Sequence, residues 1–219
     1  MAVGLITKPK RKTRKIAPYG SRDAGIPMTL DEFEAAEFEL GSRYEIIRGL
    51  LVVSPAPLAE ERGGNEYLGY LLLTYKEHHP QGSALDATLP EHDIRTGTQI
   101  RRCDRAIWVG LGRRPRTRGR PALRDRPSIV VEFPSSRRAD QRRDYVEKQE
   151  EYRDLGVLEY LIIDRFARQM VVYHWRGSRW VKRVLGERDT YRTPLLPGFE
   201  LPLAKLFAVM DEYTDAPTD

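Results

Sequence analysis

The 219-residue chain has little of what several classes of protein require. Its single cysteine, Cys103, excludes an intramolecular disulfide and a zinc site built from cysteines. No stretch approaches the roughly 20 apolar residues of a membrane span, and MAVGLITK is too short for the apolar part of a secretion signal. The four histidines lack metal-ligand spacing, so we expect them at the surface or in turns. These absences favour a soluble intracellular protein, with the cytoplasm as its expected compartment.

Positive charge is in excess, and it is unevenly distributed. The net charge is +5 and the pI is about 9.3. Basic residues concentrate in KPKRKTRK at 8–15 and in GRRPRTRGRPALRDR at 112–126, whereas acids gather in LDEFEAAEFEL at 30–40. Each basic run is either a solvated tail or loop, or a set of contacts to nucleic-acid phosphates.

The succession of apolar patterns predicts a mixed β-sheet flanked by helices, in the α/β or α+β class. No repeat of 20 to 50 residues is visible, which excludes solenoids and propellers. The expected elements are a short helix at 29–39, a hairpin at 43–55, a long helix at 58–79, brief strands over 83–112, a strand at 128–133, a helix at 138–155, a strand at 158–164, a second hairpin turning at 176–178 and an irregular closing segment.

The same patterns divide the chain into one domain and two extensions. We expect a flexible basic arm at 1–27, because this segment has no periodic apolar pattern. A single domain follows at 28–206, and 207–219 is expected to be a tail.

Two carboxylates stand in apolar strands. Glu132 interrupts the β-forming run SIVVEF, and Asp104 begins DRAIWV. If these strands are neighbours, alternation places Asp104 on one face with Ala106 and Trp108, near Glu132. A hard divalent cation such as Mg²⁺ is the usual way to keep two close carboxylates ionised. The alternative is that Asp104 caps a turn and Glu132 pairs with a buried arginine.

A lysine and two further acids extend this set. Lys148 shares one helical stripe with Tyr145 and Tyr152, so its side chain should point towards the sheet, unless it is a structural lysine that reaches out to solvent. Asp144, one turn earlier, either orients Lys148 or forms an ordinary exposed pair. Glu45 lies near the start of a strand and faces either the same pocket or solvent.

The order of RYEIIRGLLVVSPAP, CDRAIWVG and PSIVVEFPSSRRADQRRDYVEKQEEYRDLGVLEYLIIDR resembles the Uma-type (Uma-two) family of endonucleases, a branch of the PD-(D/E)XK nuclease superfamily. The resemblance covers about residues 28–206. It implies a restriction-endonuclease-like fold, hydrolysis of DNA phosphodiester bonds, and Mg²⁺ as cofactor, with Mn²⁺ as a substitute. Its expected partner is the DNA phosphate backbone, with no membrane partner; RNA as substrate and a homodimeric state stay open.

The resemblance also implies roles for individual residues. Asp104 matches the acid of the family's Pro-Asp element, Glu132 matches the acid of its (D/E)XK element, and Lys148 matches a catalytic lysine displaced to the following helix. Glu45 matches an early glutamate of the catalytic set, which would complete the metal shell through water or assist a second metal. The main-chain carbonyl of Phe133 joins Asp104 and Glu132 as a metal ligand. The expected contacts to DNA phosphates are Arg113, Arg114, Arg116, Arg118 and Arg120. Their segment lies between the strands of Asp104 and Glu132 in the chain, so we expect its ends to be tethered close to the site.

Departures from the family pattern keep a second function open. Cys103 replaces the proline before Asp104, Ser128 replaces a common aspartate, and Pro134 stands where an undisplaced lysine would be. The alternative is a nucleic-acid-binding protein that keeps the fold and has lost catalysis. A third alternative is an interaction module in which the buried charges are structural.

Overall fold

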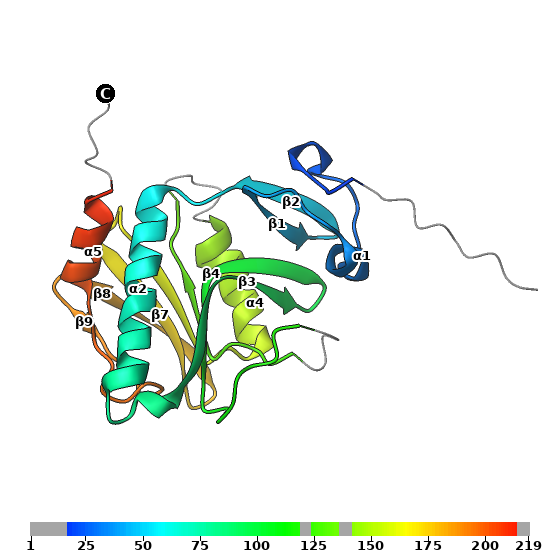
Figure 1. Cartoon of the computed structure of the whole chain (residues 1–219). Coiled ribbons are helices and arrows are strands. Elements are labelled where there is room, and N and C mark those ends of the chain that lie inside the picture. The colour runs from blue at the N-terminus through cyan, green and yellow to red at the C-terminus, as the bar shows by residue number, and fades with distance from the viewer. Residues whose placement is uncertain (1–16, 119–123, 136–141, 214–219) are drawn as a thin grey trace, which may run out of the picture.

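One large mixed sheet forms the centre of the computed structural model, which describes residues 17–118, 124–135 and 142–213 (Figure 1). The sheet has eight strands in the order β2-β1-β4-β5-β6-β7-β8, with β3 also paired to β4. The strands are β1 (Ser42–Ile47), β2 (Leu50–Pro55), β3 (Leu85–Thr96), β4 (Gln99–Val109), β5 (Ile129–Glu132), β6 (Glu159–Asp164), β7 (Gln169–Arg176) and β8 (Arg179–Gly186). Among the strands of the described residues, only β5 and β6 pair in parallel, and they flank the predicted strand-helix-strand crossover.

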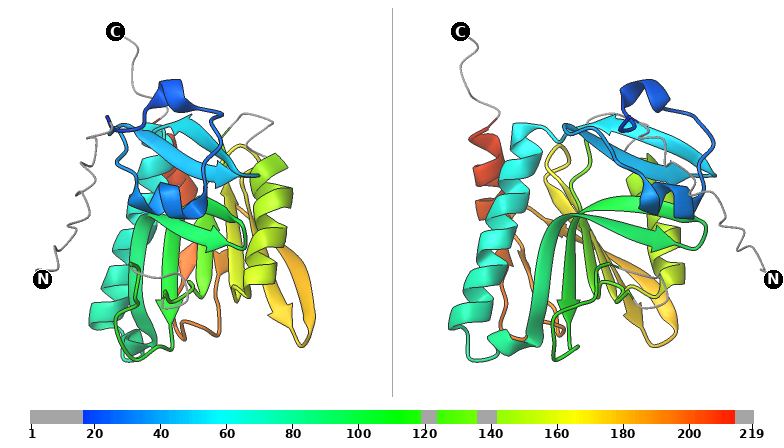
Figure 2. Two further views of the ribbon diagram at one scale, coloured as in Figure 1. Left: turned by 90° about the vertical axis from the view of Figure 1, so that its right-hand side faces the viewer. Right: turned by 45° about the vertical axis from the view of Figure 1, so that its right-hand side comes forward.

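Helices cover both faces of the sheet, as Figure 2 shows. One face packs against α2 (Ala59–His78) and α5 (Leu203–Asp211) through side chains such as Val131. The other face packs against α4 (Lys148–Leu155) through side chains such as Val130, which points to the side of the sheet opposite to Val131. The strands are therefore buried on both sides, which explains the continuous apolar run around Glu132. This architecture confirms the predicted fold class. No helix within the described ranges is long and apolar enough to cross a membrane.

The N-terminal part of the domain contains the first predicted helix and hairpin. The helix α1 (Leu30–Ala35) begins after Thr29, whose hydroxyl accepts a hydrogen bond from Glu32 N, but it ends earlier than predicted. The β1–β2 hairpin turns at Arg48 and Gly49, which have φ angles of 54° and 77°, as a tight turn between right-twisted strands requires. A separate small core joins α1 to this hairpin.

Structured residues continue beyond both ends of the expected domain. Residues 17–27 lie against the hairpin, because Gly25 N donates to Leu51 O and Leu51 N donates to Ile26 O. A short helix η1 (Ser21–Asp23) lies in this segment, and residues 1–16 are outside the described ranges. At the other end, α5 continues to Asp211 and buries Phe207 and Met210, so the first residues of the expected tail belong to the core.

Two other segments also differ from the prediction. The expected brief strands over 83–112 are the long antiparallel pair β3 and β4, preceded by a short helix η2 (Gly82–Ala84). The expected irregular closing segment contains a small two-stranded sheet, β9 (Thr190–Tyr191) and β10 (Leu201–Pro202), followed by α5. The remaining short helix, η4 (Arg143–Glu147), is a π-helical turn that leads into α4.

Candidate active site

The candidate site lies in a notch along one edge of β4. The opposite edge of β4 pairs with β3 along its length. On the notched edge, β1 pairs with β4 at Ile100, and β5 pairs with it at Arg105 to Ile107. Between these two pairings the backbone of Arg102 forms hydrogen bonds with side chains. Its N–H donates to Glu45 Oε1 at 3.0 Å, and its carbonyl accepts from Lys148 Nζ at 3.1 Å. Two predicted site residues thus replace ladder hydrogen bonds here.

The alternation of β4 breaks at Asp104. Cys103 and Ala106 are three residues apart, yet both pack in the core on the α4 side, so the regular alternation of side chains is interrupted between them. The facing residue of β3, Glu91, has a φ of 49°. Strict alternation was therefore the wrong prediction here, yet Asp104 does meet the predicted strand. Its Oδ2 accepts a hydrogen bond of 2.6 Å from the main-chain N–H of Phe133, which follows Glu132.

Lys148 points towards the sheet, as its helical stripe predicted, and meets two carboxylates. Its Nζ lies 2.9 Å from Glu132 Oε2 and 3.3 Å from Asp144 Oδ1. The three side chains are almost fully buried. Asp144 lies in the π-helical turn η4, and Lys148 follows that turn. The N–H of Lys148 donates to the carbonyl of Arg143 five residues earlier. A π-turn in a helix is frequently found at a functional site.

Burial and charge compete within this cluster. Burial raises the pKa of Glu132 well above its ordinary value; repulsion from Asp104 and Asp144 adds to this effect, and the Lys148 ammonium opposes it. Burial likewise raises the pKa of Asp144. Burial opposes the charge on Lys148, but attraction to Glu132 and Asp144 outweighs it and raises its pKa. The ammonium therefore persists at neutral pH.

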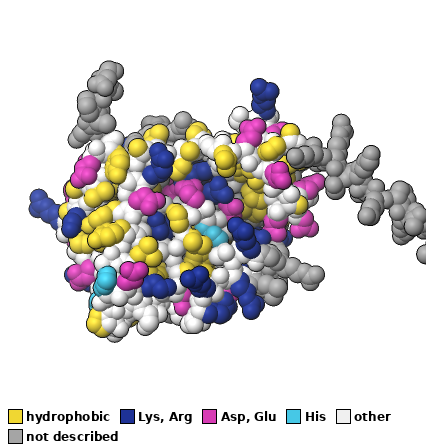
Figure 3. Space-filling view, in the orientation of Figure 1, with side chains coloured by type: hydrophobic (Ala, Val, Ile, Leu, Met, Phe, Trp, Pro, Cys, Tyr) yellow, Lys and Arg dark blue, Asp and Glu magenta, His cyan; other side chains and the backbone are white. Residues whose placement is uncertain are grey.

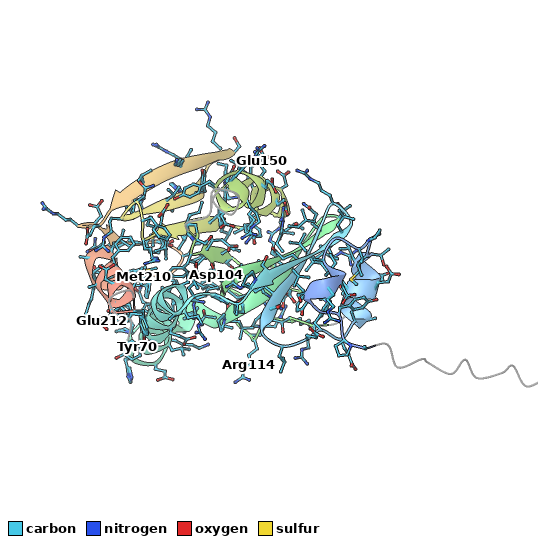
Figure 4. The ribbon with its side chains drawn as sticks, turned by 90° about the horizontal axis from the view of Figure 1, so that it is seen from above. Tyr70, Asp104, Arg114, Glu150, Met210 and Glu212 are labelled. Carbon is cyan, nitrogen blue, oxygen red and sulfur yellow. The ribbon has the colours of Figure 1, made fainter. Side chains whose placement is uncertain are left out.

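Three of these acids line one pocket of about 230 Å³. Asp104, Glu132 and Asp144 share it with two basic residues, Arg43 from β1 and Arg143 from η4. The other wall consists of the end of β2 and the segment that follows it, from Val53 to Leu58, together with Glu61 of α2. Glu45 lies beside the pocket and does not appear in its lining; its Oε2 is 4.0 Å from Arg143 Nη1. Figure 4 shows Asp104 near the middle of the molecule when it is viewed from above.

Several supporting residues were not predicted. Arg43 Nη2 lies 2.5 Å from Asp104 Oδ1, and Tyr152 OH donates to Glu132 Oε1 at 3.1 Å. Asn65, near the start of α2, donates to the carbonyl of Asp104 and accepts from Arg105 Nε. Tyr152 could have been found, because it occupies the stripe of Lys148. Arg43 and Asn65 give no such signal, since their roles depend on distant pairings.

The arginine-rich segment lies away from the pocket. It leaves β4 after Val109 and enters β5 before Ile129, at the end of the strand pair opposite to Asp104 and Glu132. This corrects the expectation, implied by chain order, that its ends are tethered close to the site. Figure 4 shows Arg114 projecting from the edge of the molecule, and Figure 3 shows basic side chains gathered over this region.

The predicted DNA contacts within this segment differ from one another. Arg113 forms a bidentate ion pair with Asp125. Hydrogen bonds from Arg113 and from the N–H of Arg116 lower the pKa of Asp125 to about 2. Arg114, Arg116 and Arg118 are exposed, and the last two line grooves that also include His92 and Arg95 of β3. The predicted contact at Arg120 lies outside the described residues.

The donor set fits a hard divalent cation in its chemistry. Four carboxylates line one pocket, those of Glu61, Asp104, Glu132 and Asp144. Repulsion among the last three is one cause of the raised pKa of Glu132 and Asp144. As the side chains stand, no group of three or more His, Cys, Asp or Glu side chains in the described ranges is arranged to hold a metal. Asp104 Oδ1 is engaged by Arg43, and Glu132 Oε2 by Lys148. A cation would therefore require Arg43 to move.

Comparison with known proteins gives one family and one fold. The sequence profile of the Uma2 family, described as "Putative restriction endonuclease", matches residues 30–204. A solved structure of "a putative nuclease belonging to DUF820" from Anabaena variabilis superposes with a TM-score of 0.64 at 15% identity. The match covers 84% of this chain and 99% of that chain, and it shows the same fold. No curated protein sequence matches.

Proposed function

Because the chain belongs to the Uma2 family, we propose that it is a nuclease that hydrolyses DNA phosphodiester bonds with Mg²⁺ at the pocket of Asp104, Glu132 and Lys148. The observation that carries this proposal is the buried contact of 2.9 Å between Lys148 Nζ and Glu132 Oε2, beside a third carboxylate in the same pocket. A phosphodiester is an anionic and poor electrophile, so its hydrolysis needs charge neutralisation and an oriented water.

Carboxylate and carbonyl oxygens would hold the cation. We assign this role to Asp104 and Glu132, together with the main-chain carbonyl of Phe133, whose N–H already bonds to Asp104. A bound divalent cation supplies neutralisation of the phosphate charge and a nucleophile at neutral pH. Glu45 accepts a hydrogen bond from the backbone N–H of Arg102 in the notch, and would so support the metal ligands indirectly.

Lys148 would donate hydrogen bonds rather than accept a proton. Its raised pKa keeps the ammonium charged at neutral pH, and Asp144 contributes to that charge state. A charged donor in a buried position can hold the attacking water or stabilise a phosphoryl oxygen. It cannot also be the general base in this protonation state.

The family and the distribution of charge support a nucleic-acid substrate. Arg114, Arg116 and Arg118 are exposed, and guanidinium groups on a loop suit the phosphate backbone better than base edges. Because this loop lies at the far end of the β4–β5 pair, its contacts would fall some distance along the DNA from the cleavage site. Arg113 would contribute less, since Asp125 already engages it.

Plasmid relaxation tests this function. Supercoiled DNA incubated with the full chain should be nicked in Mg²⁺ or Mn²⁺, and EDTA should stop the reaction. Glu132→Gln and Lys148→Met should each lower the rate by at least about 100-fold while circular dichroism shows a folded protein. Cleavage by both variants at the wild-type rate would place the active site elsewhere.

A second candidate function is DNA binding without cleavage. It is favoured by the internal pairing of the acids, because Asp104 and Glu132 already have cationic partners in Arg43 and Lys148. This function predicts salt-sensitive retention of DNA with no nicking in either metal.

A further inference from the structure

Arg43 occupies the face of Asp104 that a cation would need. Its Nη2 lies 2.5 Å from Asp104 Oδ1, while Oδ2 of the same carboxylate is taken by the N–H of Phe133. Arg43 also forms an ion pair with Glu91 of β3, so its guanidinium bridges two acids. Both Arg43 and Asp104 line the 230 Å³ pocket. A cation that uses both Asp104 and Glu132 therefore meets a guanidinium already in place.

The partners of Arg43 within the described residues are incomplete. Its Nε is buried and has no hydrogen-bond partner there. Attraction to Asp104 and Glu91 outweighs burial and keeps the side chain charged. The side chain is still one-fifth exposed, so it has room to shift towards solvent. Arg43 is thus a charged, partly satisfied group at the entrance to a buried set of acids.

We propose that Arg43 is a displaceable counter-ion that occupies Asp104 in the metal-free protein, and that a divalent cation binds by driving its guanidinium off Asp104 Oδ1. The inference rests on the proposed metal-dependent function of the same pocket. Glu91 retains the displaced guanidinium at the rim, because it is a second acid already paired with Arg43. There Arg43 can donate to a phosphate oxygen of the substrate, as planar guanidinium groups commonly do.

The proposal predicts that Arg43 weakens cation binding. Like charges compete for Asp104, so removing the guanidinium should tighten binding, whereas loss of a merely structural pair would leave binding unchanged or weaker. The probe is Mn²⁺ without DNA, with free Mn²⁺ followed by electron paramagnetic resonance. Arg43→Ala should bind Mn²⁺ about tenfold tighter than wild type, a factor typical of one charged hydrogen bond.

Arg102→Ala is the matched control. Arg102 is a similarly buried arginine on β4, but its side chain pairs with Asp93, which does not line the pocket. Its variant should bind Mn²⁺ within about twofold of wild type, since only remote charge is lost. Equal tightening in both variants would overturn the proposal, because the effect would then be general electrostatics.

Two further variants keep the test decisive. In the double variant Arg43→Ala, Asp104→Asn, the tighter binding of Mn²⁺ should be lost. If the double variant still bound Mn²⁺ more tightly than wild type, the proposal would be overturned. Arg43→Lys serves if the alanine variant does not fold. A lysine keeps the charge, but it is shorter and lacks the planar guanidinium, so Mn²⁺ binding should tighten by about threefold. Wild-type affinity in a folded Arg43→Lys, or no Mn²⁺ binding by any variant, contradicts the inference. If Arg43→Ala binds Mn²⁺ more tightly but the protein does not nick plasmid DNA, only the nuclease function is rejected. If the protein nicks plasmid DNA but Arg43→Ala does not bind Mn²⁺ more tightly, only the counter-ion role is rejected.

Discussion

Lys148 is the residue on which the proposed chemistry of the site depends most. An ammonium group surrounded by protein is unfavourable unless acids compensate it, and Glu132 and Asp144 both lie within 3.3 Å of its Nζ. The three groups form a buried cluster in which the loss of one charge leaves the others uncompensated. Stability and catalysis should therefore both respond when Lys148 is changed, but with different dependence on pH.

Lys148→Met should lower the free energy of unfolding by about 3 kcal/mol at pH 8 and by less at pH 6. Without the ammonium, burial raises the folded-state pKa of Glu132 further above its unfolded value. Stability from such a group is complete below the unfolded pKa and is lost as pH rises through the folded-state pKa. Urea unfolding of wild type and variant at the two pH values measures this difference.

Lys182→Met is the control for this experiment. Lys182 is an exposed residue of β8, so its replacement should change stability by less than about 0.5 kcal/mol at either pH. An equal penalty for Lys148→Met at pH 6 and pH 8 would show that Glu132 does not take up a proton, and would contradict the assigned electrostatics.

At the scale of elements, the site exists because β1 and β5 leave a gap along one edge of β4. Glu45 and Lys148 fill the gap with hydrogen bonds to the backbone of Arg102. The start of α2 fixes the same region from the opposite face through Asn65, which bonds to the carbonyl of Asp104. The packing of α2 against the sheet should therefore matter for the site as well as for stability.

Gly64→Ala should destabilise the protein by about 1–3 kcal/mol, because close packing leaves no room for a side chain. A Cβ there would lie 2.7 Å from Met210 Cγ and 3.1 Å from a ring carbon of Phe133, and both residues are buried. Gly63→Ala is the matched control: its Cβ would meet Tyr213, which is half exposed and can rotate away. That variant should be neutral or up to about 1 kcal/mol more stable, since alanine favours helix.

Urea unfolding measures both glycine variants. Equal effects would mean that the contact between α2, α5 and Phe133 is looser than these distances indicate.

Sequence periodicity was enough for the elements that form locally. The Arg48–Gly49 turn, the long helix and the stripe containing Lys148 each follow from neighbours in the chain. The length of β3 and β4 was not predictable, because Pro90 and Glu91 interrupt the pattern and only the distant partner strand restores it. The helix α5 was missed for a similar reason: Pro197, Gly198 and Pro202 suggest an irregular segment, whereas packing against α2 makes the residues that follow helical.

The candidate site was predictable only in part. Glu132 and Lys148 stand out as charges in apolar patterns. Arg43 and Asn65 look like ordinary polar residues, and only strand pairing brings them to Asp104. The prediction that the arginine-rich segment is tethered near the pocket failed because sequence order does not say which end of a strand pair a loop leaves.

At the scale of the whole molecule, the acidic pocket and the arginine-rich segment lie at opposite ends of β5. An extended phosphate backbone could contact both, whereas a small phosphate ester could not. This separation favours a polymeric substrate, and it makes the individual arginines testable by the salt dependence of DNA binding.

Arg114→Ala and Arg118→Ala should each reduce the salt dependence of DNA binding. The slope of the logarithm of the DNA association constant against the logarithm of the salt concentration should fall in magnitude by about 1, as the loss of one phosphate contact predicts. Arg113→Ala should change it less, because Arg113 is already paired with Asp125. Fluorescence anisotropy with a labelled duplex between 50 and 200 mM salt measures the slopes. Unchanged slopes for Arg114 and Arg118 would assign the segment to solubility rather than to DNA binding.

The most direct test of the metal-dependent site is a crystal structure of the protein soaked in Mn²⁺, with anomalous scattering to locate the ion. We expect one anomalous peak that contacts carboxylate oxygens of Asp104 and Glu132, with Lys148 beside it and Arg43 displaced from Asp104. A fully occupied Arg43–Asp104 ion pair with no peak in the pocket, or a peak bound only elsewhere, would contradict the account.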